Sequence, residues 1–352
     1  MRVAFVSMHT DLHRSDGATR RTRRTAELLA ARGHEVVVLC AQWWDGPVAE
    51  FDRDGVAYRA VTGAPAAGTF ASKVPFALRR VAPDVVQVVN SPPSHVVAAT
   101  TAARLLRVPV VVDWWCDVPG DSRAGYRRAA RGADAVLAPS RMVRTQVREH
   151  GGPGVDVDVV PEPVDMSMVR EAPVDSRADI LYARDLDSDA NVGSFLLALA
   201  ELRDREWRAA VVGDGPARGD AERMARDLRI DDRVAFLGDL PVEEVVPVMK
   251  GARVFAQTAT REPFATNLLW ALACGCVGIV EYQAESSAHE LVEKRTRGVR
   301  VTSPQELADE IISAARVDPM TVNEEFQEFD RGTVIEQYLS VYRTAAAERG
   351  LL

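Results

Sequence analysis

The sequence predicts an α/β protein made of two doubly wound parallel sheets, and three observations support this. Its 352 residues are enough for two hydrophobic cores of ordinary size. Short apolar runs without polar alternation recur along the chain, separated by segments with helical spacing, as in repeated βαβ units. Between Val159 and Asp179 prolines and scattered acids interrupt this rhythm, and a second cycle follows. Two Rossmann-like domains joined by a linker are therefore expected.

The first cycle begins with the apolar run Val3 to Met8, followed by a polar loop. The helical pattern from Thr19 to Arg32 ends at Gly33, which suits a C-cap. Further buried strands are predicted, with helices between most of them, at Val36–Cys40, Val56–Val61, Val85–Val89, Val108–Val112 and Ala135–Ala138. These elements define a first domain over residues 1–163.

The second cycle defines a domain over residues 164–330. Its predicted strands are Ile180–Ala183, Ala209–Val212, Val234–Leu237, Val254–Gln257 and Val277–Val280. Its predicted helices are Val192–Leu202, Ala221–Leu228, Val242–Met249, Asn267–Ala273 and Ser286–Val292. Residues 331–352 hold a last amphipathic helix, which we expect to pack back on the first domain.

Composition excludes several classes of protein. The longest apolar runs are far shorter than the roughly 20 residues that a membrane-spanning helix needs. Arg2 runs straight into a strand, unlike the start of a signal peptide. The four cysteines have neither metal-binding spacing nor the pattern of a disulfide framework. We therefore expect a cytoplasmic protein with reduced cysteines and no bound metal.

Charge is distributed unevenly along the chain. Residues 1–150 hold 21 Lys and Arg against 14 Asp and Glu, while residues 151–352 hold 22 against 37. A basic first half suggests an anionic partner, either a phosphate-bearing acceptor or the inner face of an acidic membrane. Solvated helix faces explain the same charges, since the arginines between Arg20 and Arg24 need no ligand. No nucleic-acid partner is expected.

A Gly-rich turn follows the predicted strand at Ala209–Val212. Gly213 and Gly215 would let the backbone approach a ligand, and the helix after the turn offers free N–H groups to an anion. Many α/β proteins turn in this way without a ligand. The turn therefore predicts a binding site only together with other signals.

A second candidate site begins at Glu262 and runs into a predicted helix through Phe264, Ala265, Thr266 and Asn267. The partial positive charge and unpaired N–H groups of a helix start favour a diphosphate, and the upstream carboxylate could hold sugar hydroxyls. The alternative is that Thr266 and Asn267 only cap the helix.

Arg184, the Gly213–Pro216 turn, Glu262 with Phe264, and Ala271–Gly275 together resemble the family 4 (group 1 type) retaining glycosyltransferases of the GT-B fold. The resemblance covers nearly the whole chain and includes the loop with Gly17. It implies two Rossmann-like domains facing across a cleft. The first domain would hold the acceptor and the second a nucleotide diphosphate sugar, which is a substrate; no cofactor is implied.

The resemblance also implies roles for single residues on the donor side. The family pattern is Glu, seven residues, Glu: the first acid faces the donor sugar and the second holds the ribose. Glu262 matches the first, but Trp270 stands at the second, as pocket wall or core. Arg184 matches an arginine that neutralises donor phosphate, while the lysine expected about five residues later falls near Asp189. Glu290 matches a family acid near the cleft, although a helix-surface role explains it equally well.

On the acceptor side, many relatives carry a histidine after the fourth strand, and this chain does not. Asp113 and Asp117 are the polar groups available there to orient an acceptor hydroxyl; capping of turns is the alternative. Asp117 joins Glu262 and Arg184 as the predicted catalytic set. His9 and Gly17, after the first strand, are predicted near the acceptor.

The predicted function is therefore transfer of a sugar from a nucleotide diphosphate sugar, with retention and without a metal. The acceptor is unknown: a glycan, a lipid-linked saccharide or a small molecule. The missing second Glu, Lys and His keep a non-catalytic GT-B partner or scaffold open, and a nucleotide-sugar epimerase of the same fold is another alternative. A nicotinamide-dependent oxidoreductase is disfavoured, because no G-x-G-x-x-G follows the first strand.

Overall fold

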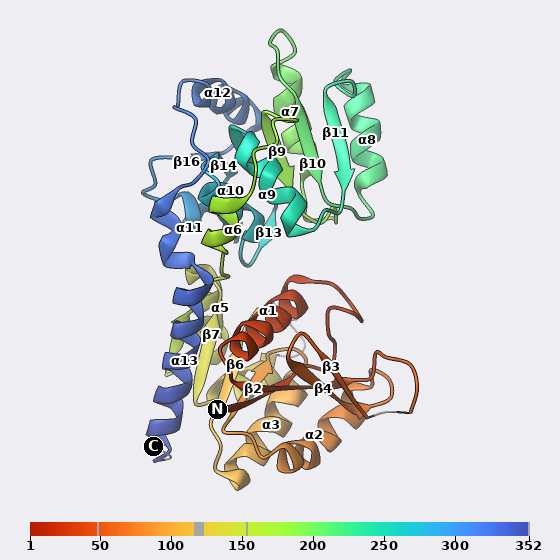
Figure 1. Cartoon of the computed structure of the whole chain (residues 1–352), viewed down its shortest axis with the longest axis vertical. Coiled ribbons are helices and arrows are strands. Elements are labelled where there is room, and N and C mark those ends of the chain that lie inside the picture. Colours follow the sequence, from red (N-terminus) through yellow and green to blue (C-terminus); the bar gives the residue numbers. More distant parts are fainter. Residues whose placement is uncertain (48, 116–122, 153, 351–352) are drawn as a thin grey trace. The chain divides into compact units, whose positions relative to one another are not determined.

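The computed structural model describes residues 1–47, 49–115, 123–152 and 154–350 (Figure 1). The chain forms two compact units, and each is described by itself. Unit 1 holds residues 1–162 and the chain from Gly332 onward, and unit 2 runs from Pro163 to Arg331. The C-terminal helix thus belongs to the same unit as the N-terminal half. No helix in the described ranges is long and apolar enough to cross a membrane.

The described part of unit 1 is built on one eight-stranded sheet. Its strands are β1 (Arg2–Val6), β2 (Glu35–Ala41), β3 (Glu50–Arg53), β4 (Val56–Thr62), β5 (Val85–Val89), β6 (Val110–Asp113), β7 (Ala135–Ala138) and β8 (Val157–Val159). Their order is β3-β4-β2-β1-β5-β6-β7-β8, and every neighbouring pair is parallel except β3 with β4. The central strands are continuous valine-rich runs because helices cover both faces.

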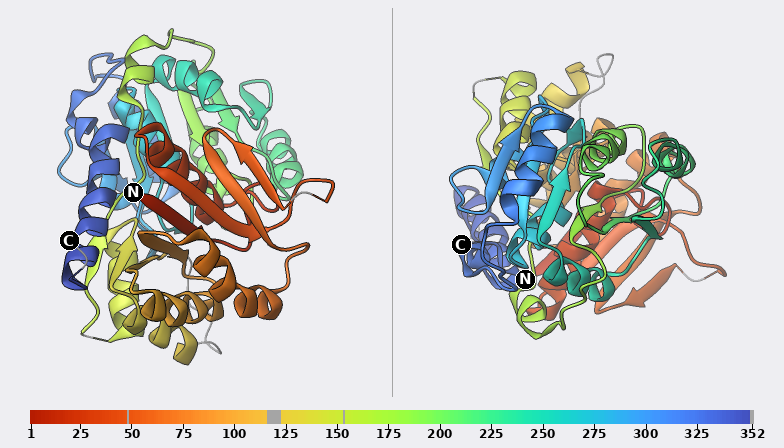
Figure 2. Two further views of the ribbon diagram at one scale, coloured as in Figure 1. Left: turned by 60° about the horizontal axis from the view of Figure 1, so that its bottom comes forward. Right: turned by 90° about the horizontal axis from the view of Figure 1, so that it is seen from above.

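Helices cover this sheet in two layers (Figures 1 and 2). They are α1 (Gly17–Ala31), α2 (Ala67–Val81), α3 (Pro93–Leu106), α4 (Arg123–Gly132), α5 (Arg141–Gly151) and α13 (Arg331–Glu348). Helices α2 to α5 share one hydrophobic core with the sheet, whereas α1 and α13 pack together on its other face. The predicted packing of the last helix on the first domain is what the structure shows.

Unit 2 contains a six-stranded parallel sheet. Its strands are β9 (Ile180–Ala183), β10 (Ala209–Val212), β11 (Val234–Gly238), β12 (Val254–Gln257), β14 (Val277–Glu281) and β16 (Gly298–Val301). Their order is β11-β10-β9-β12-β14-β16. Beside it, the short strands β13 (Arg261–Glu262) and β15 (Glu285–Ser286) pair with each other.

The helices of unit 2 connect these strands. They are α6 (Met166–Glu171), α7 (Val192–Glu201), α8 (Arg218–Asp227), α9 (Val242–Gly251), α10 (Thr266–Ala273), α11 (His289–Val292), α12 (Pro304–Ala314) and the 3₁₀ helix η2 (Glu324–Phe329). Helices α7, α8 and α12 share one core with the sheet. The two parallel-sheet units confirm the predicted fold class.

The structure departs from the sequence predictions where segments are short and polar. Strand β3 was not expected, because its four exposed residues have no apolar pattern. A helix was predicted over Ser286–Val292, but Ser286 belongs to β15 and α11 begins only at His289. Backbone pairing with β13 holds Ser286 in extended form, which side-chain periodicity cannot reveal. The predicted linker region likewise contains α6.

Candidate functional site

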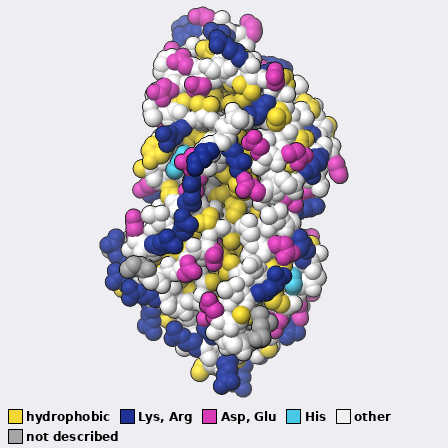
Figure 3. All heavy atoms as spheres, turned by 90° about the vertical axis from the view of Figure 1, so that its left-hand side faces the viewer, with side chains coloured by type: hydrophobic (Ala, Val, Ile, Leu, Met, Phe, Trp, Pro, Cys, Tyr) yellow, Lys and Arg dark blue, Asp and Glu magenta, His cyan; other side chains and the backbone are white. Residues whose placement is uncertain are grey.

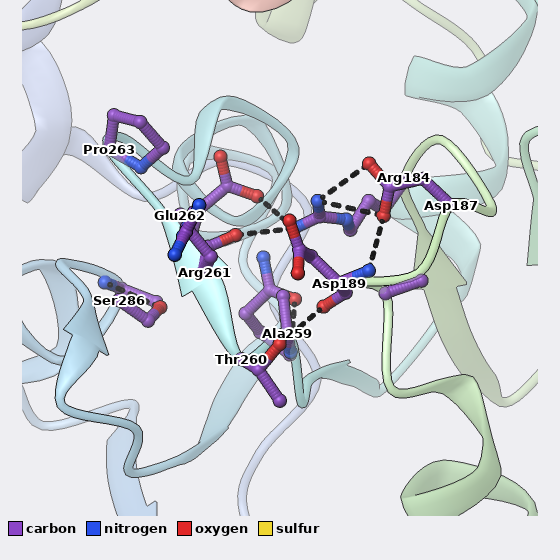
Figure 4. A network of polar contacts seen from close by, with 12 residues as sticks. Arg184, Asp187, Asp189, Ala259, Thr260, Arg261, Glu262, Pro263 and Ser286 are labelled. Carbon is purple, nitrogen blue, oxygen red and sulfur yellow. Dashed lines mark hydrogen bonds and ion pairs between the residues drawn. The ribbon is translucent and has the colours of Figure 1, made fainter. Parts of the chain in front are cut away.

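Arg184 and Glu262 meet at the carboxyl edge of the unit 2 sheet. Arg184 directly follows β9, and Glu262 lies on β13, beyond the end of β12. In Figure 4 the side chains of Arg184, Glu262 and Asp187 point toward one another. Arg184 Nη1 donates to Glu262 Oε2 at 2.8 Å, and Nη2 lies 3.2 Å from both oxygens of Asp187. The two predicted donor-side residues are therefore in direct contact.

The guanidinium of Arg184 is held in its charged form. Burial alone would lower the pKa of Arg184, but the charges of Glu262 and Asp187 outweigh burial and raise it above the ordinary value. The side chain of Arg184 is 13% exposed, that of Glu262 17% and that of Asp187 45%. No described group accepts a hydrogen bond from Arg184 Nε. This atom is buried, so a ligand would meet the outer nitrogens of the guanidinium, whose planar charged group suits a phosphate or carboxylate.

The Gly-rich turn supports the loop that carries Arg184. Gly213 and Gly215 have φ of +124° and +148°, which side chains rarely allow. A Cβ on Gly213 would overlap the carbonyl oxygen of Arg184, and one on Gly215 would lie 2.5 Å from that of Leu186. Backbone hydrogen bonds from Arg184 to Val212, at the end of β10, and from Leu186 to Asp214, in the turn, hold this close approach. The glycines therefore bring one backbone segment against another.

Replacing Gly213 with alanine is expected to destabilise unit 2 by about 2 to 5 kcal/mol, because strain at positive φ adds to the clash with Arg184. Thermal unfolding would measure the loss. Gly219→Ala is the control, since Gly219 is helical and a Cβ there has nothing within 4 Å; it is expected to be neutral or slightly stabilising. Equal stability of Gly213→Ala and the unmodified chain would contradict this role of the turn.

The start of α10 lies next to Arg184. Its N-cap is Ala265, and no side chain caps the helix. Asn267 instead donates from its amide to the carbonyl of Ala183 at 3.0 Å, which ties the first turn to the end of β9. Phe264, before the helix, is buried. The alternative in which Thr266 and Asn267 serve as caps is therefore not what the structure shows, and the positive end of α10 remains available to an anion.

Trp270 lies on the same face of α10 as Thr266 and Asn267, at the spacing of one helical turn. All three residues are partly exposed, whereas Leu269 and Ala271 on either side of Trp270 are buried. Trp270 is thus outside the core, on the open side of the helix. Its role as a pocket wall stays a prediction.

Glu290 belongs to a segment that is fastened to Glu262. Strands β13 and β15 pair Glu262 with Ser286. Ser287 donates from its backbone to the carbonyl of Glu262 at 2.8 Å and from its hydroxyl to that of Pro263 at 2.7 Å. Glu290 follows in α11 and is partly exposed. The structure therefore brings the backbone around Glu290 to the candidate site.

Sequence reasoning did not assign a role to Asp187, and it considered Arg261 as a second cation for the donor phosphate. Asp187 pairs with Arg184 three residues earlier, a spacing that could have signalled the contact. Arg261, considered as a second phosphate cation, is instead paired with Glu285 at 2.7 Å across the β13–β15 ladder. That pair depends on tertiary folding and has no local signal. Both cations of the candidate site are therefore already balanced by carboxylates.

In unit 1, Asp113 is buried in an ion pair. It is 3% exposed, and both its oxygens lie 3.0 Å from Nε of Arg21, which is itself 1% exposed. Gln87 also donates to Asp113, at 3.1 Å. Burial raises the pKa of Asp113, and the charge of Arg21 partly offsets this. An acceptor hydroxyl could reach this carboxylate only if the pair were rearranged.

Arg21 connects several elements of unit 1. Beyond Asp113, its guanidinium donates to Glu162 at 2.9 Å and to the carbonyl of Val160 at 2.8 Å. It also lies over the rings of Trp115 and Tyr338, at 5.7 and 5.5 Å from their centroids. Helix α1, strand β6, the last residues before unit 2 and helix α13 therefore meet at one buried cation.

Gly17 opens α1, and the indole of Trp115 covers it. A Cβ on Gly17 would lie 2.5 Å from Nε1 of Trp115. The close approach expected for a ligand is thus made by a side chain of the same unit. Asp117, the third predicted catalytic residue, lies outside the described residues.

His9 lies at the carboxyl edge of the unit 1 sheet, three residues after β1, and is partly exposed. Its ring packs edge-on against His13, with centroids 5.7 Å apart. Burial, followed by the charges of Arg14 and His13, lowers the pKa of His9. A neutral imidazole at this edge can accept a proton or a hydrogen bond, as a group near an acceptor hydroxyl must.

Two family models match the chain. Residues 16–163 match the glycosyl transferase 4-like domain, and residues 167–327 match the glycosyl transferases group 1 model. The two matches together cover most of both units. Arg184, Glu262 and the start of α10 lie within the second match.

Curated proteins of similar sequence match about half of this chain. A GDP-mannose-dependent α-(1-6)-phosphatidylinositol monomannoside mannosyltransferase of Mycolicibacterium smegmatis is 27% identical over 57% of the chain and 54% of its own length. A 2-deoxystreptamine glucosyltransferase of Streptomyces kanamyceticus is 26% identical over 51% of the chain and 54% of its own length. The chain therefore spans about half the length of these curated relatives.

Solved structures match the chain over almost its whole length. HepE of Anabaena in complex with UDP superimposes with a TM-score of 0.78 and 19% identity, covering 98% of this chain and 100% of that one. Sucrose-phosphate synthase of Thermosynechococcus elongatus has a TM-score of 0.78 and 16% identity, with 99% of each chain covered. At these identities the likeness establishes the fold.

Proposed function

Because the chain belongs to the group 1 glycosyltransferases of the GT-B fold, we propose that it transfers a sugar from a nucleotide diphosphate sugar to an acceptor. The proposal includes retention at the anomeric carbon and no requirement for a metal ion. Unit 2 binds the donor through Arg184, Glu262 and the start of α10. Unit 1 provides the acceptor side, with His9 at the carboxyl edge of its sheet.

The observation that carries the proposal is that two sources of positive potential, the Arg184 guanidinium and the start of α10, lie next to each other. The guanidinium of Arg184 and the uncapped N-terminus of α10 are linked through the Asn267 amide, which binds the residue before Arg184. Charge develops on the diphosphate as the sugar departs, and donors already oriented toward that charge stabilise the transition state. Glu262, once released from Arg184, can accept hydrogen bonds from hydroxyls of the donor sugar.

Thermal shift with a panel of UDP-, GDP- and ADP-sugars tests the donor site, because a ligand that binds only the folded chain raises its melting temperature. One sugar nucleotide is expected to stabilise the chain equally with and without EDTA. Product NMR with the donor that binds would then establish the anomeric configuration. Failure of every sugar nucleotide to stabilise the chain would contradict the proposal, and conversion of the donor to an epimer without acceptor would replace it.

We propose an acceptor that is lipid-borne or carries phosphate. Two of the curated relatives are named for lipid acceptors, the mannosyltransferase above and an α-monoglucosyldiacylglycerol synthase of Streptococcus pneumoniae, which is 23% identical over 53% of the chain. The excess of cations in residues 1–150 favours contact with an anionic membrane that would present such an acceptor. Transfer assays with lipid-borne and soluble acceptors side by side would test this, and exclusive use of soluble uncharged acceptors would contradict it.

A non-catalytic partner is the second candidate, and two observations favour it. Trp270 stands where the second Glu of the family pattern would hold the ribose, and Asp189 stands near the place of the expected lysine. A non-catalytic chain would bind a sugar nucleotide without consuming it. Release of free nucleoside diphosphate in the presence of acceptor therefore separates the two candidates.

Replacing Asp187 with asparagine is expected to tighten donor binding by up to about fivefold. Asp187 competes with the donor phosphate for Nη2 of Arg184, and its side chain is 45% exposed, so the pair itself is weak. Titration calorimetry with the donor would measure the change. Asp220→Asn is a matched control, because Asp220 pairs with an arginine three residues later on α8. Weaker binding by Asp187→Asn would show instead that Asp187 positions Arg184.

A further inference from the structure

Four consecutive helices of unit 1 present a strongly basic outer surface. Helices α2, α3, α4 and α5 contain eleven Lys and Arg residues and one acid, Glu149. Their apolar sides are buried in a common core with the sheet, so the charged sides face outward. Figure 3 shows Lys and Arg side chains gathered along the lower-left margin of unit 1.

Five of these eleven cations have no acidic partner among the described residues. Among the described residues, no ion pair or hydrogen bond involves the charged side chains of Lys73, Arg79, Arg80, Arg104 or Arg128, all of which are exposed. This contrasts with the rest of the molecule, where arginines such as Arg2, Arg59 and Arg170 form ion pairs. Cations near a helix C-terminus stabilise the helix by interacting with its dipole. That effect does not explain eleven cations on one layer of helices.

Two large apolar side chains project from the same helices. Phe76 on α2 is 76% exposed and Leu105 on α3 is 84% exposed, the highest values among the large hydrophobic residues that the structure describes as exposed. Helices α2 and α3 pack directly against each other. Phe76 lies between Lys73 and Arg79 in sequence, and Leu105 follows Arg104. We call the outer surface of α2 to α5, with Phe76 and Leu105, the basic helix face.

We propose that the basic helix face docks on an anionic lipid bilayer. Unpaired cations attract acidic headgroups, and exposed Phe and Leu side chains gain free energy by entering the boundary between headgroups and acyl chains. A nucleic acid would use the cations but offers no apolar phase for Phe76 and Leu105. The inference rests on the membrane contact included in the proposed function, and is independent of sugar transfer.

The layered fold gives such docking a consequence for the acceptor. Helices α2 to α5 run antiparallel to the strands that follow them, so their outer surface extends along the sheet from its carboxyl edge to its amino edge. A bilayer against this face would lie beside the carboxyl edge, where His9 stands. A lipid-borne acceptor could then reach that edge without leaving the membrane surface.

The experiment measures how much of the full chain sediments with lipid vesicles, at low and at high salt. The vesicles consist of phosphatidylcholine alone or of phosphatidylcholine with about 30 mol% phosphatidylglycerol. Binding is expected only to the anionic vesicles and is expected to weaken as salt rises. Arg79→Ala with Arg80→Ala should weaken partitioning about 25-fold, at about fivefold for each cation removed. The double variant Phe76→Ser with Leu105→Ser should weaken partitioning onto anionic vesicles by about tenfold or more. Its binding should still weaken as salt rises.

Leu197→Ser with Arg226→Glu in unit 2 is the matched control, since both residues are exposed; it should bind vesicles like the unmodified chain. Thermal shift by the sugar nucleotide, measured on every variant, shows separately whether the donor site is intact. Equal binding to neutral and anionic vesicles, no binding to either, or binding unaffected by both double variants would overturn the proposal. Tighter binding to single-stranded DNA than to anionic vesicles would overturn it in favour of a nucleic-acid surface.

Discussion

Arg184→Ala is expected to lower kcat for sugar transfer about 10²- to 10³-fold, the usual effect of removing one donor that stabilises developing charge. The reason is local. Asp189 stands near the place of the expected lysine, and Arg261 is paired with Glu285. Arg184 is therefore the cation best placed to act with α10 on the diphosphate. Steady-state kinetics with the donor identified by thermal shift would measure the loss.

Glu262→Gln and Arg223→Ala complete this experiment. Glu262→Gln keeps the size of the side chain but loses the charge that holds Arg184, so transfer should also fall. Arg223 is exposed on α8 and pairs only with Asp220 among the described residues, so Arg223→Ala should behave like the unmodified chain. Unfolding curves would show that all three variants are folded. Unchanged turnover in both Arg184→Ala and Glu262→Gln would show that the active site lies elsewhere.

Arg21→Met is expected to destabilise unit 1 by about 3 to 5 kcal/mol, because removal of one partner leaves buried charges uncompensated. Asp113, 3% exposed, has its ion pair with this guanidinium, and Glu162, 1% exposed, pairs with both Arg21 and the half-buried Arg24. A fall in the melting temperature of roughly 6 to 20 °C follows for a unit of this size. Arg53→Met is the control, since Arg53 and its partner Asp54 are 44% and 61% exposed and their ion pair lies at the surface. Equal melting temperatures for the two variants would contradict the role of Arg21.

The stability that Arg21→Met loses relative to the unmodified chain should depend on pH. Burial already raises the pKa of Asp113, and without Arg21 nothing of comparable strength opposes it. An acid whose pKa is higher in the folded chain than in the unfolded chain destabilises the fold as pH rises through that interval. The variant should therefore lose least stability near about pH 5 and most near about pH 8. A pH-independent difference from the unmodified chain would contradict this expectation, because it would mean that Asp113 binds no extra proton in the folded variant over this pH range.

Much of the donor side could be predicted from the sequence, and the reason is that its signals are local. Glu262 precedes a predicted helix start and was chosen from that neighbourhood, whereas Arg184, which follows a buried apolar strand, was named through the resemblance to the family. The contact between them then follows from the topology of a parallel sheet. Asp187 is three residues from Arg184, yet its pairing was not foreseen, because a loop has no fixed periodicity to show where its side chains point.

The acceptor side was harder to predict for a physical reason. Asp113 ends a strand and follows the pattern of a site residue, but its partner Arg21 is 92 residues away. Gly17 follows the pattern of a ligand-binding loop, but its close neighbour is Trp115. Both contacts depend on which helix packs on which face of the sheet. The sequence of one segment does not show how that segment packs against the others.

The sequence by itself determined the two parallel-sheet units and the break between them, because apolar runs, glycines and helix starts act over a few residues. The tertiary structure alone decided that Gly213 and Gly215 serve the Arg184 loop, that Arg21 neutralises Asp113 and Glu162, and that Phe76 and Leu105 stay uncovered. Each of these depends on groups distant in the chain and close in space, where burial sets the energy of a charge or of an apolar surface.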